Sequence, residues 1–468
     1  MPASMTGKAG GAASEPLLPV EECSCSGAAA AHGGGAASVS GAVFNVSTSI
    51  VGAGIMSIPA AMRVLGVVPA VLLTAAVAAL ANASVGFLLR YSRWGGGGGD
   101  GTYAGVMGDA FGRAGAVLLN VCVTFTTLGT LVVYLITIGD VMSGSAAGEG
   151  VHAGVLQDLF GAQWWTTREV VLLVTALVVL LPLALRRRVD SLKYTSAVSI
   201  LLAVVFILIS LGITVFAIFR GNVKMLSLTS PGFPHHLSFS QLSQSSSSHS
   251  PSISMLVKGC HQNFNFDPYA HGLHPIRAEM KTSSDMMTAV QISVVLCSAI
   301  YVAVGFFGFL LFGEATMADV LVNFDQSSGA GVPQALNDLA RLSYALHLVL
   351  VFPLLNFSLR INVDELLFQG KRQPLAMDTG RFMFLTVVLM ALMYALAIAI
   401  PSIWTLIQYG GSVFPVSLSL IFPGAIVLRD IQGIAKRKDK ALALTMICVA
   451  VISSSIAITT NIMSSRRD

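Results

Sequence analysis

Charge is what this sequence has least of. Only 11% of the 468 residues are Asp, Glu, Lys or Arg, whereas about 25% is usual in soluble globular domains. Hydrophobic residues make up 54% of the chain. This excludes a soluble globular enzyme, and it excludes a disordered chain, which needs a polar composition. Because a membrane-spanning helix needs about 20 apolar residues, the length predicts an all-α polytopic membrane protein of ten or eleven spans.

Reactive and metal-binding patterns are also missing. None of the six cysteines lies in a C-x-x-C or metal-ligand spacing. The apolar segments contain no paired carboxylates and no His/Asp cluster, so we expect no catalytic site, no metal and no cofactor. The net charge of +4 is too small to indicate a nucleic-acid partner. The lipid bilayer is the partner that the composition predicts.

Ten apolar runs predict ten membrane spans within a domain covering residues 39–462. The runs are residues 39–62, 66–92, 115–142, 168–186, 189–219, 286–312, 338–361, 379–400, 402–428 and 440–462. Residues 1–38, rich in Ala, Gly and Ser, predict a disordered cytosolic tail, and residues 463–468 predict a short C-terminal tail. Residues 220–285 contain a Ser-rich stretch and no run long enough to cross a bilayer.

The distribution of Lys and Arg predicts the topology, because cytoplasmic loops carry an excess of both. The loops after the second and fourth spans are basic and the loop after the third is acidic, which places the N-terminus in the cytosol. The acidic loop 313–337 and the later basic loops obey the same rule only if one more crossing lies within residues 221–285. We therefore expect eleven spans, the sixth of them degenerate and too polar to face lipid.

The first span contains a sequence that is poorly suited to a continuous helix. It reads Ser47-Thr48-Ser49-Ile50-Val51-Gly52-Ala53-Gly54, and Pro59 follows. Glycine and proline destabilise a helix, and unwinding in mid-membrane frees backbone amides and carbonyls that need a cavity or a ligand. Transporters use such broken helices to bind a zwitterion or an ion. Close packing of small residues is the alternative interpretation.

The same span carries the pattern Val-Phe-Asn-x-Ser-x-x-Ile-Val-Gly-x-Gly-Ile, and further patterns cover Gly305 to Gly313, Val320 to Phe324 and Arg341 to Pro353. These patterns resemble the amino acid/auxin permease family, within it a plant subgroup of vacuolar type that is related to animal neutral amino acid transporters. The resemblance implies a leucine-transporter-like fold of two inverted five-helix repeats plus one extra helix. It also implies secondary active transport of amino acids, as symport or antiport.

The resemblance further implies that the amino acid binds between the first and sixth helices. The expected substrate-binding residues are Ser47, Ser49, Ile50, Val51, Gly52, Ala53, Gly54 and Asn263. Asn263 belongs to Cys260-His261-Gln262-Asn263-Phe264, which resembles the break in the family's sixth helix. The apolar first half of that helix is replaced here by Ser-rich sequence. If this removes part of the substrate wall, the alternative function is a transport-impaired amino acid sensor or regulatory membrane protein.

Two positions bear on the coupling ion. Sodium-coupled relatives have Asn where this chain has Thr48, and Thr in the eighth helix where we align Val351. Because Val351 offers no side-chain oxygen, we expect a proton rather than sodium, with sodium the less favoured alternative. His347, one turn earlier, titrates near neutral pH and is the candidate proton site. Thr48 and Ser343 are the other coupling candidates. The alternative for His347 is a neutral histidine that forms hydrogen bonds between helices. For the protein as a whole we expect an endomembrane or vacuolar location.

Overall fold

The apolar runs fold into long helices, because a backbone inside a bilayer must satisfy its own hydrogen bonds. The computed structural model describes residues 39–94, 102–145, 152–186, 193–220, 283–317, 319–325, 333–368, 375, 377–400 and 413–465. The expected tail 1–38, Asn263 and most of the region of the expected sixth crossing lie outside these residues. Residues 37–468 form one compact unit.

Within the described ranges, seven helices are long and apolar enough to cross a membrane. They are α3 (Val67–Trp94), α4 (Tyr103–Ser143), α8 (Lys193–Phe219), α12 (Ser283–Phe312), α14 (Gln334–Leu367), α15 (Thr379–Ala399) and α19 (Arg437–Ser465). An eighth span is made of two pieces, α1 (Val39–Ile50) and a second piece that joins η1 (Ala53–Ser57) to α2 (Ile58–Leu65). The two pieces are bent by 54° at the break.

Two further apolar segments are helical but interrupted. The fourth predicted span is α6 (Arg168–Val174), a π-helical turn η3 (Thr175–Leu180) and α7 (Leu181–Ala184). The described part of the tenth is α17 (Phe414–Val416), the π-helical turn η6 (Ser417–Ile421) and α18 (Phe422–Arg429). Both contain proline, which cannot donate to the helical ladder and favours such irregular turns. The described parts of the ten predicted spans are therefore mainly helical, and the first span is interrupted at its break.

Short elements connect the spans on one side. The strands β1 (Gly144–Ser145) and β2 (His152–Ala153) pair antiparallel, a small exception to the predicted all-helical fold. They are followed by α5 (Val155–Phe160) and η2 (Trp164–Thr166). The connection between α12 and α14 holds η5 (Gly313–Ala315) and α13 (Val320–Asp325).

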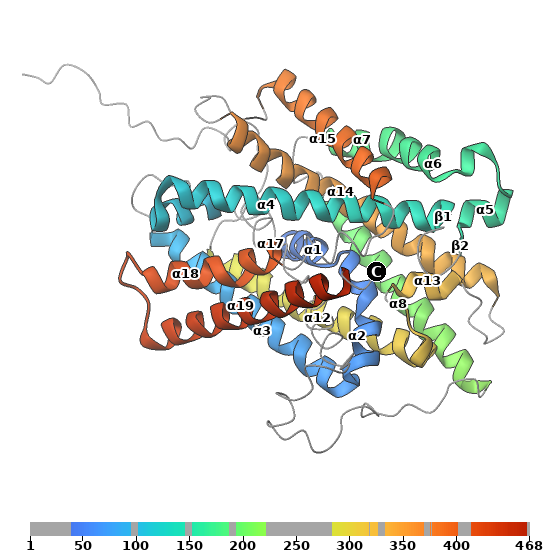
Figure 1. Cartoon of the computed structure of the whole chain (residues 1–468), viewed down its shortest axis with the longest axis horizontal. Helices are drawn as coiled ribbons and strands as arrows, with labels where there is room; N and C mark the ends of the chain where they lie inside the picture. Colours follow the sequence, from blue (N-terminus) through green and yellow to red (C-terminus); the bar gives the residue numbers. More distant parts are fainter. Residues whose placement is uncertain are drawn as a thin grey trace, which may run out of the picture. The chain divides into compact units, whose positions relative to one another are not determined.

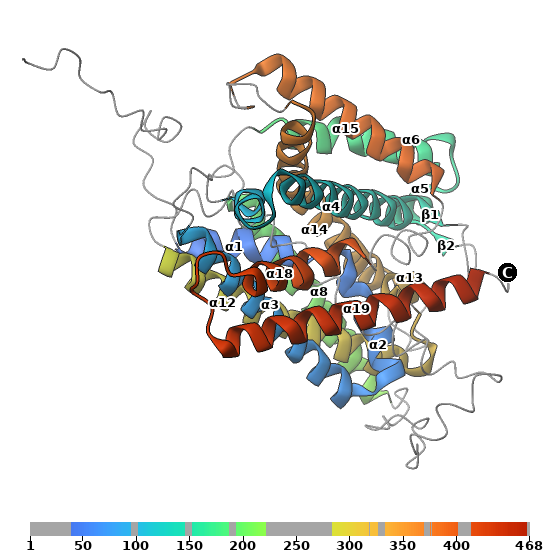
Figure 2. The ribbon, with the colours of Figure 1, turned by 60° about the vertical axis from the view of Figure 1, so that its left-hand side comes forward.

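The helix α14 is the central helix of the unit. In its most apolar window 78% of the residues are buried, against 22% for α19, so α14 belongs to the core and α19 to the periphery. It packs against α4 and α8, while α1 packs against α12 and α8 (Figure 1). The helices α18 and α19 lie side by side (Figure 2).

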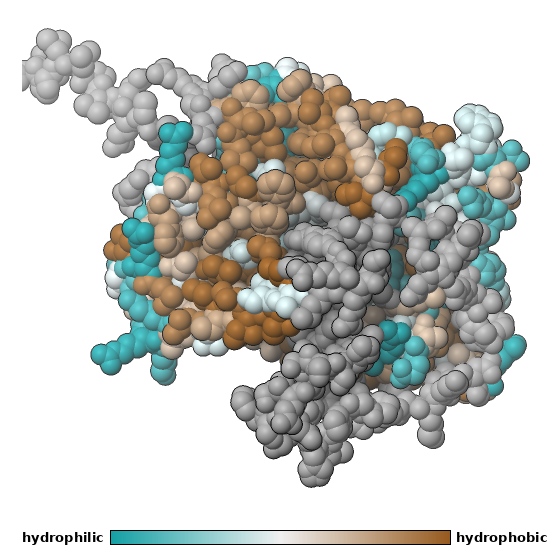
Figure 3. Space-filling view, in the orientation of Figure 1, coloured by the Kyte–Doolittle hydropathy of each residue, from teal (hydrophilic) through white to brown (hydrophobic). Residues whose placement is uncertain are grey.

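The outer surface is that of a membrane protein. Large apolar side chains are exposed on η3, α8 and α15, among them Val178, Leu201 and Phe384. The space-filling view shows this apolar surface between two polar ends (Figure 3). Exposed apolar side chains in such a band are stable only against lipid tails, so the protein is an integral, multi-pass membrane protein.

Candidate functional site

The break in the first span is the most unusual piece of backbone in the membrane region. The helix α1 ends at Ile50, and Gly52 has an extended conformation with φ −134° and ψ −168°. Among the described residues, the amides of Gly52, Ala53 and Gly54 donate to no other backbone group. The break predicted from the two glycines is therefore present, and it exposes the amides expected to bind substrate.

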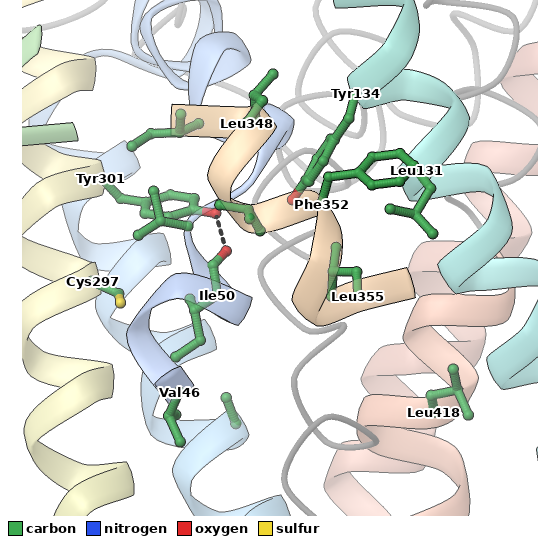
Figure 4. Packing of buried hydrophobic residues seen from close by; sticks show 14 of the residues in the cluster. Val46, Ile50, Leu131, Tyr134, Cys297, Tyr301, Leu348, Phe352, Leu355 and Leu418 are labelled. Carbon is green, nitrogen blue, oxygen red and sulfur yellow. Dashed lines mark hydrogen bonds between the residues drawn. The ribbon is translucent and has the colours of Figure 1, made fainter. Parts of the chain in front are cut away.

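Side chains from two other helices satisfy the carbonyls at the break. Tyr301 Oη, from α12, donates to Ile50 O at 3.1 Å (Figure 4). Tyr344 Oη, from α14, donates to Gly52 O at 2.7 Å. His347, also from α14, places Nε2 3.1 Å from Val51 O. Since a buried carbonyl without a partner costs about 1–3 kcal/mol, these contacts stabilise the bent conformation.

His347 joins the break to a third helix. Its side chain is fully buried, and its Nδ1 lies 2.7 Å from Ser199 O and 2.9 Å from Ser199 Oγ, both on α8. The ring of Tyr344 stacks on the imidazole with centroids 5.5 Å apart. The candidate proton site of the sequence is thus in direct contact with the broken segment.

The predicted hydroxyl groups have different partners. Thr48 Oγ1 donates to Ser196 O on α8 at 3.0 Å. Ser49 and Ser343 donate to carbonyls of their own helices, at Val46 and Ala340, both at 2.8 Å. Ser47 Oγ is buried and has no nitrogen or oxygen partner in the described part of the chain, and the thiol of Cys297 on α12 lies beside it. Of these hydroxyls, Ser47 has the unused capacity to bind a ligand.

A tyrosine that the sequence did not indicate closes one side of the break. A Cβ atom added at Gly52 would lie 2.4 Å from Tyr134 Oη and 3.4 Å from Tyr134 Cζ. Tyr134 belongs to α4 and is 1% exposed, and its hydroxyl points into the space beside α14 (Figure 4). Position 52 therefore has room for glycine alone. Neither this tyrosine nor Tyr301 stands in a motif that the sequence analysis could have used.

The described residues hold no cluster of three or more His, Cys, Asp or Glu side chains placed to bind a metal ion. The polar groups at the break are backbone amides, carbonyls, hydroxyls and one imidazole. Such a set can bind a zwitterion, a proton or a monovalent cation.

Comparison with known proteins agrees with the fold. Residues 35–465 match the family model "Transmembrane amino acid transporter protein". The chain is 48% identical to amino acid transporter AVT6C of Arabidopsis thaliana, over 96% of this chain and 97% of that protein. It is 45% identical to AVT6D of the same plant, over 96% of each. A sodium-coupled neutral amino acid transporter 7 from Bos taurus is 25% identical over 85% of this chain and 80% of its own length.

Solved structures of transporters share the fold. A Na⁺-coupled sialic acid symporter aligns with a TM-score of 0.53 at 12% identity, over 91% of this chain and 90% of its own. MhsT in complex with L-phenylalanine aligns with a TM-score of 0.53 at 15% identity, over 91% and 98%. These likenesses confirm the predicted leucine-transporter-like fold. The chain belongs to the transmembrane amino acid transporter family, as the pattern in its first span indicated.

Proposed function

We propose that this protein is a proton-coupled secondary active transporter that moves amino acids across a membrane by alternating access. The observation that carries the proposal is the position of His347, whose two ring nitrogens bridge the broken first helix and α8. A proton bound there alters contacts of the segment that is proposed to bind the substrate.

The broken helix suits the backbone of an amino acid. Its free amides at Gly52, Ala53 and Gly54 would bind the substrate carboxylate, since amides at the start of a helical segment attract anions. The substrate ammonium would bind carbonyls of the break and the unpaired hydroxyl of Ser47. Ser49, Ile50 and Val51 complete the wall. Asn263 remains a proposed substrate ligand outside the described residues.

The surroundings of His347 suit both protonation states. A neutral imidazole has one donor nitrogen and one acceptor nitrogen, whereas an imidazolium donates from both. With the proton absent, Nδ1 can accept from Ser199 Oγ while Nε2 donates to Val51 O. With the proton bound, Nδ1 can donate to Ser199 O instead. The site can therefore gain and lose a proton without leaving a buried group unsatisfied.

Sodium coupling is the less favoured alternative. Val351 is fully buried and gives the eighth helix no side-chain oxygen at its aligned position, and Thr48 already donates to Ser196 O. The endomembrane or vacuolar location remains part of the proposal, and the distribution of basic loops favours an N-terminus in the cytosol.

Uptake by purified protein in proteoliposomes tests the proposal. Labelled neutral, basic and acidic amino acids are presented under a proton gradient or a sodium gradient, each without the other. We expect uptake with the proton gradient alone, and flux that requires sodium and ignores pH contradicts the coupling. Binding of a labelled amino acid without uptake under either gradient favours the sensor function.

Variants at the proton site sharpen the test. His347→Gln keeps two hydrogen-bonding groups but cannot be protonated, so we expect proton-driven uptake to be lost while exchange of labelled for unlabelled substrate persists. Ser199→Ala removes the hydroxyl that serves the neutral ring and is expected to shift the pH dependence of uptake. Ser298→Ala is the matched control, because Ser298 Oγ donates only to Val294 O of its own helix. Unchanged proton-driven uptake by His347→Gln refutes the assignment.

A further inference from the structure

A short connection lies against the end of the broken helix. The α13 segment, residues Gly313–Met317 with Asp319–Asp325, joins α12 to α14. Arg63, near the end of α2, donates from NH1 to the carbonyls of Thr316 and, at 3.2 Å, Glu314. The helix α13 also contacts η1, β2 and α14. The segment therefore covers the broken helix on the side where α2 ends.

The α13 segment is held by its own hydrogen bonds, and a series of aromatic contacts connects it to the break. The Asn323 side chain accepts from Met317 N at 2.7 Å and donates to Ala315 O at 2.8 Å, which closes the segment on itself. The Phe324 ring packs on Phe206 with centroids 5.8 Å apart, and Phe206 packs on Tyr344 at 5.7 Å. Tyr344 is the side chain that holds Gly52 O.

Asp319 is the titratable group at the start of α13. It is half-buried, and its Oδ1 accepts from Leu321 N at 2.9 Å. The positive charge of Arg341 on α14 attracts the Asp319 carboxylate. The carboxylate also interacts electrostatically with Asp140 of α4 and with the Tyr344 hydroxyl. Arg341 and Asp140 have partners of their own, Asp338 at 3.9 Å and Arg168 at 3.3 Å.

The remaining surroundings of Asp319 add two charged groups. Arg63 approaches from α2 through the segment's carbonyls, and the Glu314 side chain is exposed. The element η1, Ala53–Ser57, contains no titratable side chain. The strand β2 contributes one titratable residue, His152, whose side chain lies outside the described part of the structure. Asp319 is therefore a half-buried carboxylate at the start of α13 that makes no ion pair among the described residues, and the nearby charge of Arg341 attracts it.

We propose that Asp319 is a second proton-binding site, and that a proton bound there stabilises the α13 segment in its closed position over the broken helix. The role of Asp319 in transport rests on the proposed proton coupling, whereas proton binding at Asp319 does not. A proton taken up from the side that the segment covers would favour closure of that side, as transport by alternating access requires.

The direction follows from linkage. Burial raises the pKa of Asp319 from 3.8 to about 6, against the lowering effects of the Leu321 amide and Arg341. In an open segment the carboxylate is solvated and has its ordinary pKa, so the closed state binds the proton more tightly. Closure is then favoured fully below the ordinary pKa and loses this contribution as the pH rises through about 6. Between about pH 5 and about pH 7.5 the closed-to-open ratio should fall roughly tenfold.

Accessibility of an introduced thiol measures this ratio without transport. Leu321, 3% exposed, is replaced in Leu321→Cys, and the purified protein is placed in nanodiscs. The rate of modification by a thiol reagent is divided by the rate for the same thiol in unfolded protein at that pH. Labelling of the parent protein is subtracted, because Cys448 is exposed. We expect the normalised rate to rise roughly tenfold between about pH 5 and about pH 7.5.

Two second-site variants decide the role of Asp319. With Asp319→Asn the side chain stays neutral, and the rate should remain at its low, acidic value at both pH values. With Glu314→Gln, the matched change at an exposed position of the same segment, the rise should persist. Asp319→Glu keeps an ionisable group and should retain a rise, which guards against a merely misfolded Asn variant. A rise in Asp319→Asn equal to that in Glu314→Gln, or a high rate at both pH values, overturns the proposal.

Because thiol labelling needs no substrate flux, the two proposals fail separately. Loss of proton-driven uptake with an intact labelling response contradicts the proposed function alone. An absent labelling response with intact uptake contradicts the role of Asp319 alone.

Discussion

A few side chains from α4, α12 and α14 stabilise the bent form of the break. Tyr301, Tyr344 and His347 bond to consecutive carbonyls, and Tyr134 fills the space beside Gly52. A helix interrupted in mid-membrane needs such partners, because lipid offers none. The site is therefore a tertiary arrangement, and removing one partner should affect transport more than it affects insertion into the membrane.

Replacing Gly52 by alanine tests the contact with Tyr134. The new methyl group would meet Tyr134 Oη at 2.4 Å, and overpacking of this kind costs about 1–3 kcal/mol. We expect Gly52→Ala to lower both the thermal midpoint and amino acid uptake. The double variant Gly52→Ala with Tyr134→Phe removes the clashing oxygen and should recover part of the thermal midpoint. No recovery in the double variant contradicts the steric explanation.

Removing the Tyr344 hydroxyl tests the support of the break. Tyr344→Phe leaves Gly52 O without its donor, at a cost of about 1–3 kcal/mol. We expect uptake to fall at least several-fold, with a measurable loss in thermal midpoint. Tyr394→Phe is the control, because its hydroxyl donates to Glu169 O at 3.3 Å on the exposed side of α15. Equal effects of the two variants on uptake would mean that the break does not depend on Tyr344.

At the scale of residues, the sequence predicts features that can be recognised within a single helix. The glycines and hydroxyls of the first span indicate the break, and an isolated intramembrane histidine indicates His347. The tyrosines were missed because tyrosine in a membrane helix has no special meaning until its neighbours are known. Tyr344 and Gly52 are 292 residues apart in the chain, and only the packing of α14 against α1 brings them together.

At the scale of elements, hydropathy locates the spans better than it locates their ends. The third span was predicted from residue 115, yet α4 begins at Tyr103. Its first turns carry Asp109 and Arg113, and the chain bends at Gly112, where φ is 69°. The backbone at Gly112 is not helical, so the turns before it form a separate helical piece whose composition does not suit lipid. The helix α14 likewise extends past the apolar run, from Gln334 to Leu367, and polar contacts hold its C-terminal end, Asp364 with Arg381 and Glu365 with Asn120.

The pairing of α2 with α12 depends on two glycines. A Cβ at Gly305 would lie 2.6 Å from Ile58 Cγ2, and one at Gly308 would lie 2.7 Å from Pro59 Cγ. Both contacted side chains are stiff, so alanine at either position should lower stability by about 1–3 kcal/mol. Gly212→Ala on α8 is the matched control, since a Cβ there meets nothing within 4 Å. Thermal unfolding in detergent distinguishes them, and equal midpoints for Gly308→Ala and Gly212→Ala contradict the prediction.

At the scale of the whole molecule, an ionic contact ties the end of α3 to the turn between α18 and α19. Tyr91 Oη donates to Asp430 Oδ1 at 2.7 Å, and Lys440 Nζ lies 3.1 Å from Asp430 Oδ2. Partial burial raises the pKa of Asp430, but these bonds and two backbone amides outweigh it, so its pKa lies below the ordinary value. The carboxylate therefore stabilises the fold above its ordinary pKa and loses this effect as the pH falls through the lowered value.

Asp430→Asn tests that contact. At neutral pH we expect the free energy of unfolding to fall by about 1 kcal/mol or less, because Lys440 is largely solvated. This loss should be seen as a lower thermal midpoint. The difference from the parent protein should shrink as the pH falls from about 4 through the lowered pKa of Asp430, because the parent carboxylate then becomes protonated as well. Asp158→Asn, at an exposed position of α5, should leave the midpoint unchanged. A difference between Asp430→Asn and parent that is the same at all pH values would show that charge is not its cause.

Contacts between distant loops also bear on the number of crossings. Arg63 bonds to the carbonyls of Glu314 and Thr316, so the end of α2 and the end of α12 lie on the same side of the membrane. Starting from the end of α2, the four spans α3, α4, α6–α7 and α8 return the chain to that side at Phe219. The helix α12 must begin on the opposite side, at Ser283, to finish beside Arg63. We therefore propose that the chain crosses the membrane an odd number of times between these two helix ends.

One additional crossing gives eleven, the number that the basic loops predict, and eleven crossings put the two termini on opposite sides of the membrane. Epitope tags at the N-terminus and after Asp468, probed by protease in sealed vesicles of known orientation, test this directly. We expect the N-terminal tag on the cytosolic side and the C-terminal tag on the other. Tags accessible from the same side would mean an even number of crossings, and would require a different course for the chain between α8 and α12.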